Sequence, residues 1–128
     1  MRLLLDTHAV IWWFLDDPAL SRSSRGAIGS ADAEVLVSAV SAMEITLKFR
    51  LGKLARAARL AANFEAMVLD YGFKPLSISL AHASLAGSLD FHHKDPFDRL
   101  LIAQALVEDM TLVSNERVFD SVGVKRLW

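Results

Sequence analysis

The chain has 128 residues, no cysteine and a formal net charge of −1, and 53% of its residues are hydrophobic. This length suits a single domain over residues 1–128 with a sizeable core. The missing cysteines exclude disulfides and thiolate metal sites and fit a cytoplasmic protein. The near-zero charge excludes a field over the whole molecule that attracts nucleic acid, so any basic surface must be local.

Apolar strand signals alternate with helix signals along the first half of the chain. Residues 3–5 and 35–37 are short apolar runs without alternation, which is typical of strands covered on both faces. Helices are predicted over residues 9–15, 21–29 and 42–51. Ser41 and Glu44 have the spacing of a capping box at the start of the third helix, and Gly52 supplies its left-handed stop.

The second half of the chain continues the same alternation. Helices are predicted over residues 54–71, 79–89 and 96–107, strands over 73–77, 111–114 and 124–128, and a short turn or helix at 118–119. Pro75 makes the strand at 73–77 an edge strand or an irregular one. The expected fold class is therefore α/β, with a mostly parallel central sheet of four to five strands and helices on both faces. No apolar stretch is long enough to cross a membrane, so no membrane association is expected.

Four acids lie at the points where strands give way to the next element. Asp6 follows the strand at 3–5, Glu44 follows the strand at 35–37 by a short turn, Asp98 opens the helix at 96–107, and Glu116 follows the strand at 111–114. Because the carboxyl ends of parallel strands line one crevice, we expect these four acids to meet.

Each acid also has an explanation in local structure. Asp6 can cap the next helix, Glu44 can complete a capping box, and Asp98 and Glu116 can occupy first helical turns that favour negative charge. Their shared topological level nevertheless favours a cation site. Carboxylates without cysteine or a His-x-x-x-His spacing suit Mg²⁺ or Mn²⁺ better than zinc. Since such an ion can activate water and stabilise a leaving oxygen, we expect metal-dependent phosphodiester hydrolysis.

The chain resembles the PIN domain family, in particular the VapC-type ribonuclease toxins of toxin–antitoxin pairs. The resemblance rests on LLDTH at 4–8 with Trp12 and Trp13, SAVSAMEI at 38–45, residues 48–54, DPFDRLLIAQA at 95–105, and the tail from 112–114 to Phe119 and Trp128. It implies that Asp6, Glu44 and Asp98 are catalytic residues that bind the metal ion. The fourth family acid is usually an Asp in a Thr-x-Asp turn. Here the turn is Ser114-Asn115-Glu116, and the longer side chain of Glu116 implies a water-bridged catalytic role.

The resemblance further implies a single-strand-specific endoribonuclease with an RNA substrate, a cognate antitoxin protein that blocks the acids, and a homodimer. A local basic group, Lys48, Arg50 and Lys53, together with Arg99, is the candidate RNA-binding surface, although a solvated helix face explains the first three equally well. Of the consecutive aromatic residues at 12–14, one or two are expected in the core and the remainder against a partner protein.

Three alternative functions remain at this point. A catalytically impaired relative that only binds a partner is compatible with the substituted fourth acid. A receiver-type signalling domain would need paired acids at the first strand, where Asp6 stands alone. A phosphatase of the haloacid-dehalogenase kind would need a second Asp two residues after Asp6, where this chain has His8.

Overall fold

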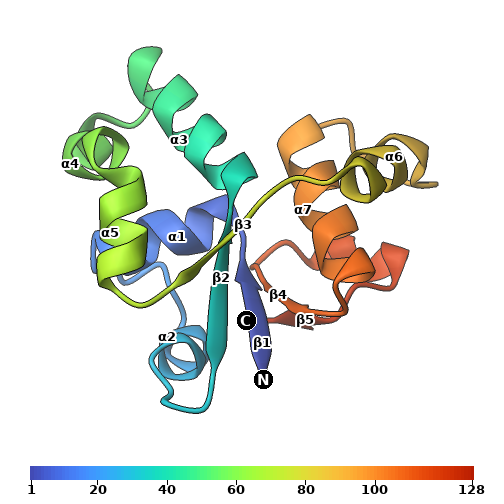
Figure 1. Ribbon diagram of the computed structural model, residues 1–128, viewed down its shortest axis with the longest axis horizontal. Helices are drawn as coiled ribbons and strands as arrows, with labels where there is room; N and C mark the ends of the chain where they lie inside the picture. Colours follow the sequence, from blue (N-terminus) through green and yellow to red (C-terminus); the bar gives the residue numbers. More distant parts are fainter.

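The structure, a computed structural model, describes residues 1–128 and contains one parallel sheet. Its five strands run in the spatial order β3-β2-β1-β4-β5, and they are β1 (Arg2–Leu5), β2 (Glu34–Ser38), β3 (Lys74–Leu76), β4 (Thr111–Val113) and β5 (Arg126–Leu127). All four strand pairs are parallel. From β1 the chain adds β2 and then β3 on one side of β1, and afterwards adds β4 and β5 on the other side of β1. The strand order therefore reverses between β1 and β4 (Figure 1).

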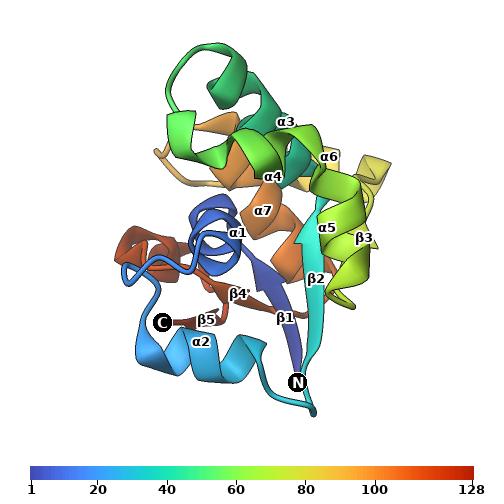
Figure 2. The same cartoon turned by 90° about the vertical axis from the view of Figure 1, so that its left-hand side faces the viewer.

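Helices cover both faces of this sheet. The helices are α1 (Thr7–Phe14), α2 (Arg22–Ile28), α3 (Ala39–Arg50), α4 (Ala58–Ala62), α5 (Phe64–Asp70), α6 (Leu80–Ser88) and α7 (Pro96–Val107), with 3-10 turns η1 (Ala55–Ala57) and η2 (Arg117–Val122). Helices α1, α2, α4 and α5 lie on one side and α6 and α7 on the other (Figures 1 and 2). This arrangement confirms the expected α/β fold class. None of the helices combines the length and the apolar character that a membrane span requires.

The alternation of side chains along β1 divides the interior into two cores. Leu3 and Leu5 point to the core that is closed by α1, α2, α4 and α5, whereas Leu4 joins the core beneath α7 and η2. All three side chains are fully buried. A central strand buried on both faces explains why residues 3–5 are uniformly apolar.

Helix α3 begins three residues earlier than the sequence predicts, and the capping box at its start is a wrong prediction. Ser38 is the N-cap, and its hydroxyl accepts a hydrogen bond from the Val40 N–H at 3.0 Å. Ser41 lies inside the helix, where its hydroxyl pairs with that of Thr7 at 3.0 Å. A serine at the end of β2 thus caps the helix at once, and Glu44 lies in the second turn, free of a capping role.

The single helix predicted over residues 54–71 is wrong as well. The structure has η1, α4 and α5 there, and α4 and α5 meet at Asn63, whose backbone leaves the helical region at φ −131°. The Asn63 side chain donates to the Arg59 carbonyl at 2.9 Å, which is the local competition that makes asparagine unfavourable within helices. Other predicted boundaries are confirmed: Gly52 and Gly72 have φ values of +78° and +82°, and Ser79 caps α6.

Candidate active site

Asp6 links the end of β1 to the start of α1. Its N–H donates to the Val113 carbonyl on β4 at 3.1 Å, and its carboxylate accepts from the Ala9 N–H at 2.8 Å as the helix N-cap. The residue is only 4% exposed. Burial raises the pKa of Asp6 to about 6, against the lowering effects of hydrogen bonds from Ser114 and Ala9 and of the nearby His8; the charge of Asp98 raises it further. Asp6 is therefore a buried carboxyl at the point of strand-order reversal.

Glu44 faces the interior from the second turn of α3. The residue is 3% exposed, and its Oε2 atom forms an ion pair with Lys48 one turn later, at 2.5 Å. Its other oxygen, Oε1, is buried and has no hydrogen-bond partner. A buried carboxylate oxygen without a partner has an unfavourable solvation energy, so this atom is suited to accept a cation or a donor.

Asp98 lies in the first turn of α7, three residues after the N-cap residue Asp95. Asp95 accepts hydrogen bonds from the N–H groups of Phe97 and Asp98. The Asp98 carboxylate lies 2.6 Å from His93 Nε2. Burial raises the pKa of Asp98, the His93 contact lowers it, and the charges of Asp95 and Glu44 raise it. The charge of Asp98 in turn is one of the smaller causes that raise the pKa of Asp6.

Glu116 lies in the turn between β4 and η2. Its N–H donates to the Ser114 hydroxyl at 3.1 Å, but its half-buried carboxylate forms no hydrogen bond or ion pair. Moreover, no three His, Asp or Glu side chains lie close enough, as they stand, to hold one metal ion. The four acids therefore do not form a preassembled metal site in this structure.

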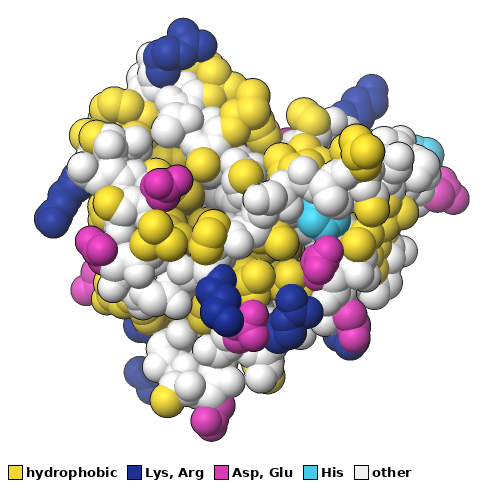
Figure 3. All heavy atoms as spheres, in the orientation of Figure 1, with side chains coloured by type: hydrophobic (Ala, Val, Ile, Leu, Met, Phe, Trp, Pro, Cys, Tyr) yellow, Lys and Arg dark blue, Asp and Glu magenta, His cyan; other side chains and the backbone are white.

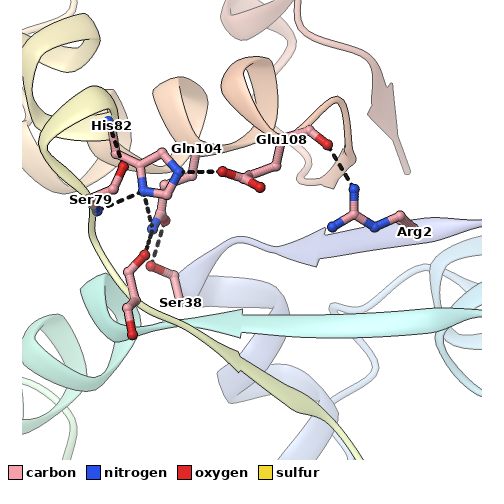
Figure 4. A network of polar contacts seen from close by, with 7 residues as sticks. Arg2, Ser38, Ser79, His82, Gln104 and Glu108 are labelled. Atoms are coloured by element: carbon pink, nitrogen blue, oxygen red, sulfur yellow. Dashed lines mark hydrogen bonds and ion pairs between the residues drawn. The ribbon is translucent and has the colours of Figure 1, made fainter.

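The helices that carry Glu44 and Asp98 are joined by a buried polar network (Figure 4). The Ser38 hydroxyl, the N-cap of α3, donates to Gln104 Oε1 on α7 at 2.6 Å. Gln104 Nε2 donates to the Ser77 carbonyl at 3.3 Å and lies 3.5 Å from His82 Nδ1. Since Nδ1 also accepts from the Ser79 N–H, the His82 proton is on Nε2, which faces Glu108 at 2.9 Å. This network fixes α3 against α7, and hence Glu44 relative to Asp98.

The loop before α7 is held by Arg99. Its guanidinium donates to five backbone carbonyls, those of Ala86, Gly87, Leu89, Phe91 and His93. His93 also stacks on Phe91, with ring centroids 5.4 Å apart. The Arg99 donors are thus engaged in placing His93 beside Asp98. A phosphate contact by Arg99 would require it to give up these hydrogen bonds.

The remaining candidate RNA-binding residues lie along and beyond α3. Lys48 is paired with Glu44, whereas Arg50 and Lys53 are exposed and form no ion pair. On the face shown in Figure 3, basic side chains are interspersed with acidic ones and with apolar surface. Any attraction for RNA at this surface is therefore local, as the net charge indicates.

Sequence reasoning did not assign the contacts that three residues make around the site: Ser114, His93 and Gln104. Gln104 gave a usable signal, because a single amide inside an otherwise apolar helix face must find a buried partner. Ser114 and His93 gave none, since a hydroxyl after a strand and a histidine in a polar loop are common on protein surfaces.

The side chains present are compatible with a divalent cation. The Oε1 atom of Glu44 has no hydrogen-bond partner, and the burial of Asp6 disfavours the charged form of its carboxyl group. A cation would offset both costs, and the donors are carboxylate oxygens, which Mg²⁺ and Mn²⁺ prefer. The side chains must move closer together before one ion can contact three of them.

The fold defines the class of protein. It is an α/β protein with a parallel five-stranded sheet, and buried acids follow its strands at the carboxyl edge. The chain belongs to the PIN domain family, whose model matches residues 3–125. This match confirms the resemblance that the sequence motifs indicated.

Relatives and solved structures agree with this assignment. A curated relative, ribonuclease VapC22 of Mycobacterium tuberculosis, is 28% identical over 115 residues, which cover 90% of this chain and 87% of the relative. Similar solved structures include VapBC2 of Rickettsia felis bound to a promoter DNA fragment (TM-score 0.70, 14% identity, 99% of this chain and 98% of that one). FitAcB of Neisseria gonorrhoeae is also similar (TM-score 0.70, 20% identity, 98% and 96%). At these identities the structures support the fold.

Proposed function

We propose that the protein is an endoribonuclease that cleaves phosphodiester bonds of RNA with Mg²⁺ or Mn²⁺ and acts as the toxin of a toxin–antitoxin pair. The observation that carries this proposal is the match of the PIN domain model to residues 3–125, and it is supported by the burial of Asp6 and Glu44 and by the unpartnered Oε1 atom of Glu44. The relative that is named a ribonuclease covers almost the same length of chain, which supports the choice of RNA as substrate.

Asp6, Asp98 and Glu44 would hold the metal ion, and Glu116 would reach it through water. When bound, the metal ion supplies an activated water and stabilises the leaving oxygen of the phosphodiester. The chain's own residues orient these acids: the Ala9 N–H holds Asp6, His93 holds Asp98, and Lys48 holds Glu44. Burial also keeps competing water away from Asp6 and Glu44.

The proposed partners follow from the same family membership. Several similar solved structures are toxin–antitoxin complexes, such as one from Klebsiella pneumoniae with a TM-score of 0.60. We therefore infer a protein antitoxin that covers the acidic edge, a homodimer of this chain, and action in the cytoplasm, where RNA is present.

A catalytically impaired binding protein is the second candidate, and the position of Glu116 favours it. Glu116 stands in the turn where the family usually has an Asp, and its carboxylate forms no hydrogen bond or ion pair within the protein. Such a protein would still bind its antitoxin and would cut no RNA.

Cleavage of single-stranded RNA by the purified chain distinguishes the two candidates. Cleavage should appear with Mg²⁺ or Mn²⁺ and stop with EDTA. Asp6→Asn and Asp98→Asn should each lower the rate by about a hundredfold or more, since even groups that only support metal ligands are worth about 10- to 100-fold. Asp70→Asn, an exposed acid at the end of α5, is the matched control and should keep full activity. Cleavage that persists under chelation would reject the proposed metal dependence.

A further inference from the structure

An aromatic stack lies beside the acidic site, at the start of α1. His8 is exposed, and its ring stacks on Trp12 one turn later, with centroids 5.3 Å apart and an interplanar angle of 23°. Trp12 in turn meets the edge of Trp128, with centroids 5.7 Å apart. Trp12 and Trp128 are half-buried against the hydrophobic core. The stack is thus anchored at its inner end and open at His8.

The fold does not use His8 for any polar contact. Its ring forms no hydrogen bond and no ion pair within the protein, and one of its faces is covered by Trp12. The other face of the ring is available to a planar ligand, and both ring nitrogens are free to bond with it. This differs from His82 and His93, whose rings are bonded to Glu108 and Asp98.

The position of His8 places this open face near the proposed reaction centre. His8 follows Asp6 by two residues in the first turn of α1, and its charge acts on that carboxyl. The same Trp12 lines a hollow of about 270 Å³ together with Lys53 and Arg56. Lys53 has no acidic partner within the protein, whereas Arg56 is paired with Asp17 at 3.3 Å. Aromatic rings flanked by unpaired positive charge are the features with which proteins bind single-stranded nucleic acids.

We propose that the exposed face of His8 binds a nucleobase of the single-stranded RNA substrate, which stacks on the His8–Trp12 pair as a third ring next to the acidic site. This subsite rests on the proposed ribonuclease function and adds to it a base-binding position that the acids themselves do not supply. A protein ligand is the less favoured occupant, because a flat ring backed by a second ring matches a base better than an aliphatic side chain. Stacking accepts any base, so the subsite would position the strand without selecting a sequence.

Binding of a fluorescent single-stranded oligoribonucleotide, measured by anisotropy, tests this proposal. The measurements use the Asp98→Asn protein in EDTA, so that the RNA stays intact. His8→Ala should weaken binding about tenfold, the loss expected for one base–aromatic stack. His8→Phe keeps a flat ring without charge and should bind within about twofold of the parent protein. Replacing the RNA bases one at a time by abasic riboses should identify one position whose loss weakens the parent protein but not the His8→Ala protein.

The outcomes separate this inference from the proposed function. Equal RNA binding by the His8→Ala protein would overturn the base subsite while leaving the ribonuclease proposal in place. Equally weak binding by His8→Ala and His8→Phe would also overturn it, because charge would then explain the effect. If the parent protein binds no RNA and the wild-type chain cuts none, both proposals fail. If His8→Ala loses only a co-expressed antitoxin, the surface belongs to a protein partner and the RNA subsite is wrong.

Discussion

At the residue scale, the N-cap role of Asp6 conflicts with the burial of its side chain. Its carboxylate caps α1, which requires an acceptor, yet the group is buried, which disfavours a negative charge. An asparagine would serve as an equally good N-cap without the charge. The retention of a carboxyl group here therefore costs stability, and we attribute that cost to a functional need for negative charge at this point.

Asp6→Asn should stabilise the protein at alkaline pH and leave it unchanged at acid pH. The folded pKa of Asp6, about 6, lies above its ordinary value of 3.8, so the folded protein holds this proton more tightly than the unfolded chain. Stability from this group is therefore complete below pH 3.8 and is lost as pH rises through about 6. At about 1.4 kcal/mol for each pKa unit, the variant should gain up to about 3 kcal/mol near pH 8.

Urea unfolding of both proteins across the pH range measures this difference. Asp70→Asn, an exposed acid with no ion pair, is the control and should follow the wild-type curve at every pH. A wild-type protein that is as stable as Asp6→Asn near pH 8 would show that Asp6 bears no such cost.

At the element scale, the relation of α3 to α7 decides whether Glu44 and Asp98 can act together. The two helices come from distant parts of the chain, and the Ser38–Gln104 hydrogen bond joins them within the core (Figure 4). Both residues are essentially inaccessible to water. An unpaired polar group at this depth costs more than a hydrogen bond contributes, so the pair acts as a unit.

Gln104→Leu should lower the free energy of unfolding by about 1–3 kcal/mol, because it leaves the Ser38 hydroxyl without its acceptor and the Ser77 carbonyl without its donor. Ser38→Ala should also destabilise, through loss of the cap on α3. The double variant should be more stable than the sum of the two losses predicts, since removing both partners leaves fewer unsatisfied groups. Chemical unfolding of the four proteins gives this interaction energy, and additive losses would contradict a coupled pair.

Arg99→Lys should loosen the loop between α6 and α7 while keeping the charge. A lysine cannot reproduce the fork that reaches carbonyls from Ala86 to His93, so a loss of about 1–3 kcal/mol is expected. Limited proteolysis should cut the variant within residues 89–94 faster than the wild type. Arg22→Lys, at an exposed arginine without an ion pair, is the control. Unchanged proteolysis of Arg99→Lys would mean that other contacts hold the loop.

The start and end of an element can be predicted from the sequence where they are determined by residues close to them in the chain. The left-handed glycines at 52 and 72, the Ser79 cap and the Asp95 cap each act within a few residues, and all four were predictable. The break at Asn63 and the start of α3 at Ala39 depend on competing hydrogen bonds that a hydrophobic pattern does not reveal. Ser41 has the spacing of a capping box, but its hydroxyl is hydrogen-bonded to that of Thr7. This contact joins distant segments of the chain, so the local spacing does not reveal it.

At the scale of the whole molecule, the parallel sheet places the segments that carry Asp6, Asp98 and Glu44 at one edge of the sheet. Strand order reverses between β1 and β4, so the segments after these strands and the N-termini of α3 and α7 converge on one edge (Figure 1). This convergence was predictable from the alternation of strands and helices. The hydrogen bond from the Glu116 N–H to the Ser114 hydroxyl in the turn after β4 was not predictable from this alternation.

Mg²⁺ or Mn²⁺ should raise the thermal stability of the wild-type protein, and this prediction tests the site without requiring catalysis. A ligand that binds only the folded state stabilises it by about 2.7 kcal/mol at a free concentration of 100 times its dissociation constant. Asp98→Asn removes the central acid of the three and should abolish most of this gain. Asp70→Asn should keep it.

The comparison is made at constant ionic strength, with a monovalent salt in place of the divalent one. A wild-type chain that gains no stability from either ion would reject the metal site. A chain that gains stability but cuts no RNA would have a working cation site without catalysis, and Glu116 would then be the acid to replace. In that case Glu116→Asp, which supplies the acid that the family usually has in this turn, should recover cleavage without a large change in metal affinity.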